Sequence, residues 1–243
     1  MTPPTTPRRR LLIGATSFTD AQAALHLTER LAETLAGDLC GILVEETIVT
    51  EIVDLPGQRV VTSSGTLVVA PSSQQVRTFV ESDARLFHDT LSDLARNKER
   101  DWSFERRHGD LIAGLCEAAK GWDILLLGHR EINKRHGKVV LVAPPMTASQ
   151  RAVELAEGLA SALRADLVAI TIGSENASTA QRQVFSTEAA LLAHINRTNT
   201  SVVVMDLSAG PLHTHDQLRH LLSVARCPVL VFGASGDPPE PDE

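Results

Sequence analysis

Tyrosine is absent from this 243-residue sequence, and aromatic residues make up only 3% of it. Proteins that bind single-stranded nucleic acid stack bases on such rings, and the same scarcity disfavours a carbohydrate cleft. A surplus of cations is also missing, because the formal net charge is -7 and duplex binding needs Lys and Arg to neutralise phosphates. The sequence therefore predicts no nucleic-acid partner.

Cysteine is scarce as well: Cys40, Cys116 and Cys227 lie far apart in apolar surroundings. They form no C-x-x-C pair and no metal-ligand spacing, so we predict reduced core thiols. No apolar run approaches the roughly 20 residues of a membrane span, and residues 1–10 combine Pro and Arg with no apolar segment behind them. We therefore expect a cytoplasmic protein without membrane contact, with disordered tails at residues 1–9 and 234–243.

An internal repeat is the most informative feature that is present. Residues 11–44 align without a gap on residues 139–172, and about a third of the aligned positions are identical. Each copy reads as an apolar run, apolar residues at helical spacing, and a second apolar run after an Asp, which is the pattern of a βαβ unit. Any two βαβ units share this periodicity, but periodicity does not require identical polar residues such as Gln22 and Gln150. These identities favour a true repeat.

The repeat predicts an α/β fold with doubly wound parallel sheets in two unequal copies. The first copy is expected over residues 10–137, with an insertion at about 46–75, and a shortened second copy over residues 138–233. Further patterns predict a β-ribbon turning near Ser64 and Gly65, helices over residues 73–98, 110–120, 187–197 and 216–225, and strands over residues 102–107, 123–128, 201–206 and 228–232. The last helix and strand have no counterpart in the first copy.

Two stretches resemble the universal stress protein family in its tandem form. FERRHGDLIAGLCEAAKGWDILLLG, residues 104–128, is similar to the family's third strand, helix and fourth strand, and LRHLLSVARCPVLVF, residues 218–232, to its last helix and strand. The resemblance implies a Rossmann-like fold of the adenine nucleotide alpha hydrolase type and an association with stress responses. It also implies a homodimer or an intrachain pseudo-dimer, because the strand after Pro228 is expected at the sheet edge, where such strands pair two copies.

The family's nucleotide-binding members carry an acid after the first strand and a Gly-x2-Gly-x9-Gly-Ser/Thr run after the fourth. This sequence keeps only Gly128 of that pattern, and Gly210 is one place out of register. The other positions hold different residues: Thr16, Glu131 and Leu141 in the first copy, and Pro144, Asp206, Ala209 and Arg219 in the second. A carboxylate where a phosphate would sit repels it. We therefore predict a regulatory or adaptor protein that acts through protein contacts, without a cofactor and without enzyme activity.

The alternative is a sensor of a nucleotide or another anion. The loop over residues 128–138 is rich in cations and follows a strand's carboxyl end, where open parallel sheets bind ligands. Charge runs are usually exposed faces, so the favoured interpretation of this loop is a solvated basic connector. If the alternative holds, ATP or another adenine nucleotide would contact Thr16, Gly128, His129, Arg130 and Arg135. A weaker third option is a hydrolase acting on phosphoanhydrides.

Three further groups carry possible chemistry. A cluster that could ligate zinc comprises His213, His215, Asp216 and His220, although Asp216 is explained as a first-turn acid of a helix. The sequence His108-Gly109-Asp110 suggests a catalytic pair, but a turn and a helix cap explain it more simply, and Ser17 and Ser208 also suggest caps. The apolar insertion over residues 47–73 could bind a protein partner or pack on its own domain.

Overall fold

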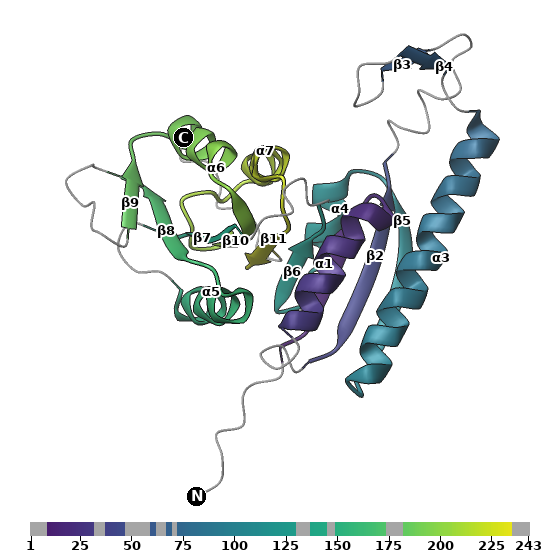
Figure 1. Ribbon diagram of the computed structural model, residues 1–243, viewed down its shortest axis with the longest axis horizontal. Helices are drawn as coiled ribbons and strands as arrows, with labels where there is room; N and C mark the ends of the chain where they lie inside the picture. Colours follow the sequence, from purple (N-terminus) through teal and green to yellow (C-terminus); the bar gives the residue numbers. More distant parts are fainter. Residues whose placement is uncertain are drawn as a thin grey trace, which may run out of the picture.

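The computed structural model describes residues 9–31, 37–46, 59–61, 67–69, 72–129, 137–144, 149–173 and 182–234. Within these ranges the chain forms one nine-stranded sheet with helices on both faces, and a separate two-stranded ribbon (Figure 1). The strand order is β5-β2-β1-β6-β11-β10-β7-β8-β9. The predicted α/β class and Rossmann-like architecture are confirmed, but the two halves of the chain share a single sheet.

The first half of the chain contributes four parallel strands in the order β5-β2-β1-β6. They are β1 (Leu11–Ala15), β2 (Leu39–Glu45), β5 (Trp102–His108) and β6 (Ile124–Leu127). The second half contributes five parallel strands in the order β11-β10-β7-β8-β9. They are β7 (Lys138–Val142), β8 (Leu167–Ile172), β9 (Arg182–Phe185), β10 (Thr200–Asp206) and β11 (Val229–Phe232).

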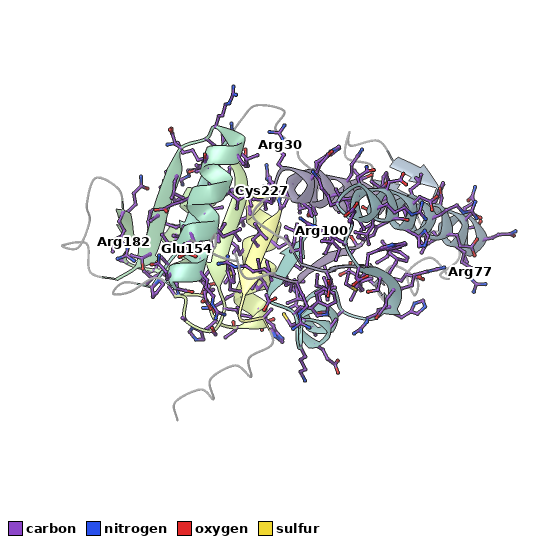
Figure 2. The ribbon with its side chains drawn as sticks, turned by 90° about the horizontal axis from the view of Figure 1, so that it is seen from below. Arg30, Arg77, Arg100, Glu154, Arg182 and Cys227 are labelled. Carbon is purple, nitrogen blue, oxygen red and sulfur yellow. The ribbon has the colours of Figure 1, made fainter. Side chains whose placement is uncertain are left out.

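The two halves join through an antiparallel pair of strands, β6 and β11, which we call the seam. Leu126 of β6 lies opposite Leu230 of β11. The expectation of an edge position for β11 is wrong, because this strand lies between β10 and β6 and all four of its residues are buried. The first half has no strand of its own after β6 and before β7 in its described residues, so β11 fills that place. Cys227, two residues before β11, accordingly lies in the middle of the molecule (Figure 2).

In the described ranges six helices form two layers that cover the two faces of the sheet. One layer contains α1 (Phe18–Arg30), α3 (Ser73–Asn97) and α5 (Gln150–Leu163), and the other contains α4 (Leu111–Ala118), α6 (Glu188–Arg197) and α7 (His215–Ala225). Each layer buries one continuous apolar core that crosses the seam, because Leu126 and Leu230 belong to one core and Leu125 and Val231 to the other. The halves are therefore packed as one unit.

The predicted elements agree closely with the observed ones. The ribbon pairs β3 (Arg59–Val61) with β4 (Leu67–Val69), while its turn at Ser64 and Gly65 and most of the insertion lie outside the described residues. The tails over residues 1–8 and 235–243 lie outside them too. β9 was not predicted, because RQVF is short and polar and has no apolar run of its own. All three cysteines are free and buried, as expected.

Candidate functional site

A parallel α/β sheet binds ligands at the carboxyl ends of its strands, and the two halves of this sheet have those ends on opposite sides of the molecule. In the first half the position is at the carboxyl ends of β1 and β6, and in the second half at those of β7 and β10. The antiparallel seam makes the strands of the two halves point in opposite directions. We name these positions the first cleft and the second cleft, after the place where parallel α/β sheets bind ligands.

Asp20 supplies the first cleft with an internal anion. Its carboxylate accepts hydrogen bonds from the hydroxyls of Ser17 at 2.6 Å and Thr16 at 3.2 Å. Ser17 is the N-cap of α1, as its position after β1 suggested, and its Oγ accepts the amide hydrogen of Asp20 at 3.2 Å. A helix N-terminus attracts negative charge, and here the side chain of Asp20 provides that charge. Sequence analysis had not assigned Asp20 to the site.

Gly128, the one retained motif glycine, allows the end of β6 to pack closely against Ala15 and Asp20. Its amide donates to the carbonyl of Gly14 at 2.7 Å. A Cβ at Gly128 would lie 2.7 Å from the carbonyl oxygen of Asp20 and 3.2 Å from the Cβ of Ala15. The end of β6 therefore touches the first turn of α1, so the structure brings Thr16 and Gly128 together with Asp20 between them. His129 follows directly, whereas Arg130, Glu131 and Arg135 lie outside the described residues.

The second cleft is occupied in the same manner by Asp206. Asp206 is the last residue of β10 and is only 7% exposed. Its Oδ1 accepts from the Ser208 amide at 3.0 Å, the Ser208 hydroxyl at 2.6 Å and the Ala209 amide at 3.2 Å. Successive backbone amides that converge in this way form an anion-binding nest. Asp206 and Ala209 were predicted as departures from the nucleotide motif, and the structure shows that they bind each other.

Tight loop packing completes the second cleft. A Cβ at Gly210 would lie 2.3 Å from the carbonyl oxygen of Asp206. Gly233 has a φ of +64°, and a Cβ there would lie 2.5 Å from the Ser208 hydroxyl. Ser208 therefore stabilises the loop after β10 by its hydrogen bonds to Asp206. The expectation that Ser208 caps a helix is wrong, because Thr214 is the N-cap of the next helix. Pro144, two residues after the end of β7, accepts a hydrogen bond on its carbonyl oxygen from the Arg182 guanidinium of β9.

The remaining motif positions lie away from the clefts. Leu141 is an interior residue of β7 and only 4% exposed. Arg219 lies on α7, where its guanidinium donates to both carboxylate oxygens of Asp110 at 3.0 and 2.9 Å, and it also pairs with Asp216. Asp110 belongs to the first half and Arg219 to the second, so this ion pair joins α4 to α7 across the seam. The Ala113 amide and then Arg219 hold the pKa of Asp110 below its ordinary value of 3.8.

Replacing Arg219 with alanine should lower the free energy of unfolding by at most about 1 kcal/mol, because the ion pair is half exposed to water. A carboxylate with a depressed pKa stabilises the fold above its ordinary value and loses that contribution as the pH falls through its folded pKa. The difference between Arg219→Ala and wild type should therefore shrink in urea titrations as the pH drops below 3.8. Arg151→Ala, at an exposed position of α5, is the control, and a difference independent of pH would contradict the prediction.

Of the histidine cluster and the catalytic candidates, Asp216, Asp110 and Gly109 have structural roles. Among the described residues no group of three or more His, Cys, Asp or Glu side chains could hold a metal. Asp216 lies in the first turn of α7, as expected, and the His213 amide donates to Gln217. Asp110 caps α4 through the Ala113 amide at 2.8 Å, and Gly109 turns the chain with a φ of +136°. The predicted turn and cap are confirmed.

The thiols are poorly suited to nucleophilic chemistry. Burial, and more weakly the charge of Asp110, raises the pKa of Cys116 to about 11. Burial also raises the pKa of Cys40. The reactive species is the thiolate, which is a minor form of such groups near neutral pH.

In the described residues no helix is both long and apolar enough to cross a membrane.

Comparisons with known proteins identify the fold. No protein-family model matches the sequence, and no curated protein matches it. A universal stress protein from Archaeoglobus fulgidus matches in structure with a TM-score of 0.52, covering 93% of this chain and 96% of its own at 10% identity. A functionally unknown protein from Pseudomonas aeruginosa has a TM-score of 0.49, covering 93% of both chains at 12% identity. A universal stress protein family member from Burkholderia pseudomallei has a TM-score of 0.34, covering 68% of this chain and 98% of its own at 17% identity. The first match shows that this chain has the fold of a universal stress protein.

Proposed function

We propose that this chain is a universal stress protein-like regulatory or adaptor protein of the cytoplasm, which acts through protein contacts and does not bind ATP. The observation that carries this proposal is that each cleft holds a carboxylate of the chain itself. Asp20 fills the first cleft and Asp206 the second, and both are hydrogen-bonded to the groups that an anionic ligand would need. We further propose that the chain is a tandem pair of degenerate repeats without catalytic activity.

Electrostatics supports the loss of nucleotide binding. Two like charges about 4 Å apart repel each other by roughly 1 kcal/mol in bulk water and by about 4 kcal/mol near a protein surface. A triphosphate in either cleft would meet a fixed carboxylate and would have to displace its hydrogen bonds. The backbone amides of Ser208 and Ala209, which could otherwise bind a phosphate, already donate to Asp206.

The seam supports an intrachain pseudo-dimer. The resemblance implies that two copies pair through the strand after the last helix. In this chain that strand is β11, and it pairs with β6 of the same chain. This pairing removes the strand edge that a second molecule would otherwise need at this position. A monomer in solution is consistent with the proposal, although a homodimer could still form through another surface.

The second candidate function is an anion sensor at the first cleft. The observation in its favour is that Thr16 and Gly128 converge where β1 and β6 end, next to His129. Its cations Arg130 and Arg135 would have to reach the same place. Reversing the charge of these two residues would abolish ligand binding if this function holds, and would leave it unchanged if the loop is a solvated connector.

Isothermal titration calorimetry with Mg-ATP is expected to show no binding heat for the wild-type chain, because both clefts hold carboxylates. Nucleotide should also be absent from protein purified without treatment, when the denatured supernatant is analysed by chromatography. Phosphate release from ATP with added divalent metal should equal the rate in buffer. Stoichiometric ATP binding that is lost on reversing Arg130 and Arg135 would overturn the proposal in favour of the sensor.

A further inference from the structure

The outer edge of the sheet at β5 presents a second set of chemical groups, remote from both clefts. In the described residues β5 pairs only with β2, so one side of this seven-residue strand carries no strand partner there. Phe104 faces α3, because it contacts the same side of Gly41 as Leu91 and Phe87. Since side chains alternate along a strand, Trp102, Phe104, Arg106 and His108 share that face. Figure 1 shows α3 running along this margin of the molecule.

A shallow, open hollow of about 330 Å³ lies between α3 and β5, and we call it the crevice. Phe104 and Arg106 line it from the strand, and Glu81, Arg85 and His88 line it from the helix. The His88 ring packs edge-on against Trp102 at 5.1 Å and against Phe104 at 5.7 Å. This chain has two Trp and six Phe in all, so the concentration of rings here is unusual for its composition. Aromatic rings beside Arg are typical of residues that anchor protein interfaces.

The crevice contains two guanidinium groups in different states. Arg106 donates two hydrogen bonds, at 2.9 and 2.7 Å, to Glu45, whose side chain is only 9% exposed. This buried carboxylate holds Arg106 in place beside the crevice, and the outer part of the guanidinium stays accessible because the Arg106 side chain is 43% exposed. Arg85 is exposed and has no hydrogen bond or ion pair to any residue in the described part of the chain. A guanidinium binds a carboxylate by donating paired hydrogen bonds, so the N–H groups of Arg85 can still bind a carboxylate.

We propose that the β5 edge binds an extended acidic segment of a partner protein as an added strand. Main-chain hydrogen bonds to β5 would supply affinity, and an Asp or Glu side chain entering the crevice between Arg85 and Arg106 would supply specificity. Charge complementarity selects this occupant, because the anion meets an Arg106 fixed by Glu45 and an Arg85 that has no partner among the residues the structure describes. Glu81, the acid that also lines the crevice, restricts the favourable position to the side of Arg85 and Arg106. This inference rests on the adaptor role proposed above and names the surface that carries it.

A displayed library of random dodecamer peptides, selected on the full-length chain with excess soluble Arg85→Glu as competitor, tests the proposal. The enriched peptides should place Asp or Glu at alternate positions between β-branched residues. The synthetic consensus peptide should bind wild type at least about tenfold more tightly than Arg85→Glu by fluorescence anisotropy. Arg151→Glu, on α5 of the other half, should bind as wild type does, and the peptide should slow hydrogen exchange within β5.

Three results of the peptide experiments would overturn the proposal. They are enrichment of peptides without acids, equal affinity for wild type and Arg85→Glu, and protection from exchange at a site other than β5. Self-association of the wild-type chain that Arg85→Glu disrupts in sedimentation would assign the edge to a second copy and would also refute it. ATP binding by wild type would remove the adaptor function argued from the clefts, yet a peptide that protects β5 would still establish this surface, so the two failures can be told apart.

Discussion

Replacing Asp206 with alanine is expected to lower the free energy of unfolding by about 3 kcal/mol. The carboxylate is 7% exposed and accepts from two backbone amides and a hydroxyl. Alanine would leave the amides of Ser208 and Ala209 without an acceptor in a loop that is already tightly packed. Urea titration followed by far-UV circular dichroism would measure the change.

The same variant tests whether the second cleft is an anion site filled from within. Inorganic phosphate or sulfate should raise the urea midpoint of Asp206→Ala and leave that of wild type unchanged, because only the variant exposes free amides. Asp216→Ala is the matched control, since that carboxylate is 83% exposed and its loss should change stability by less than about 0.5 kcal/mol. Equal stability of Asp206→Ala and wild type would show that the nest contributes nothing.

Replacing Leu230 with alanine should destabilise the whole chain by about 2 to 5 kcal/mol. Leu230 is fully buried and faces Leu126 across the seam, in the core that both halves share. The only tryptophans, Trp102 and Trp122, lie in the first half, while Leu230 belongs to the second. Tryptophan fluorescence therefore reports whether damage in one half unfolds the other.

The fluorescence and circular dichroism transitions of Leu230→Ala should coincide at a lower urea concentration than in wild type. Leu86→Ala, at a side chain 46% exposed on α3, should shift the midpoint little. If the fluorescence transition of Leu230→Ala stayed at the wild-type midpoint while the dichroism transition split, the halves would be independent domains. The continuous core across the seam would then contribute little to cooperativity.

Most elements of the fold could be predicted because their signals are local. The alternation of apolar runs with helical spacing located β1, α1 and β2, and the caps at Ser17 and Asp110 were assigned from position alone. β9 was not predicted, because this short polar edge strand is stabilised by its neighbour β8 and its own residues show no strand pattern. The edge position predicted for β11 failed because strand order depends on which partner is available, and β6 had none other on that side.

The candidate site was predictable only in part. The departures from the nucleotide motif at Thr16 and Asp206 are visible in the residues themselves. Only the distances in the structure show that the Asp20 carboxylate accepts from two hydroxyls and the Asp206 carboxylate from two amides. An Asp followed two positions later by Ser is a known turn pattern, and this pattern could have suggested the contact of Asp206 with Ser208. The pairing of Arg219 with Asp110, far away in the chain, had no signal in the sequence.

By itself the sequence determined the α/β class, the two βαβ units and the absence of the glycines that a nucleotide loop needs, because these are properties of residue type and spacing. The tertiary structure alone decided that β11 closes the first half through the seam and that Asp20 and Asp206 occupy the two clefts. The physical reason is that hydrogen bonds select whichever donors the folded chain places within about 3 Å. Those donors are set by the packing of distant elements and cannot be read from the order of the residues.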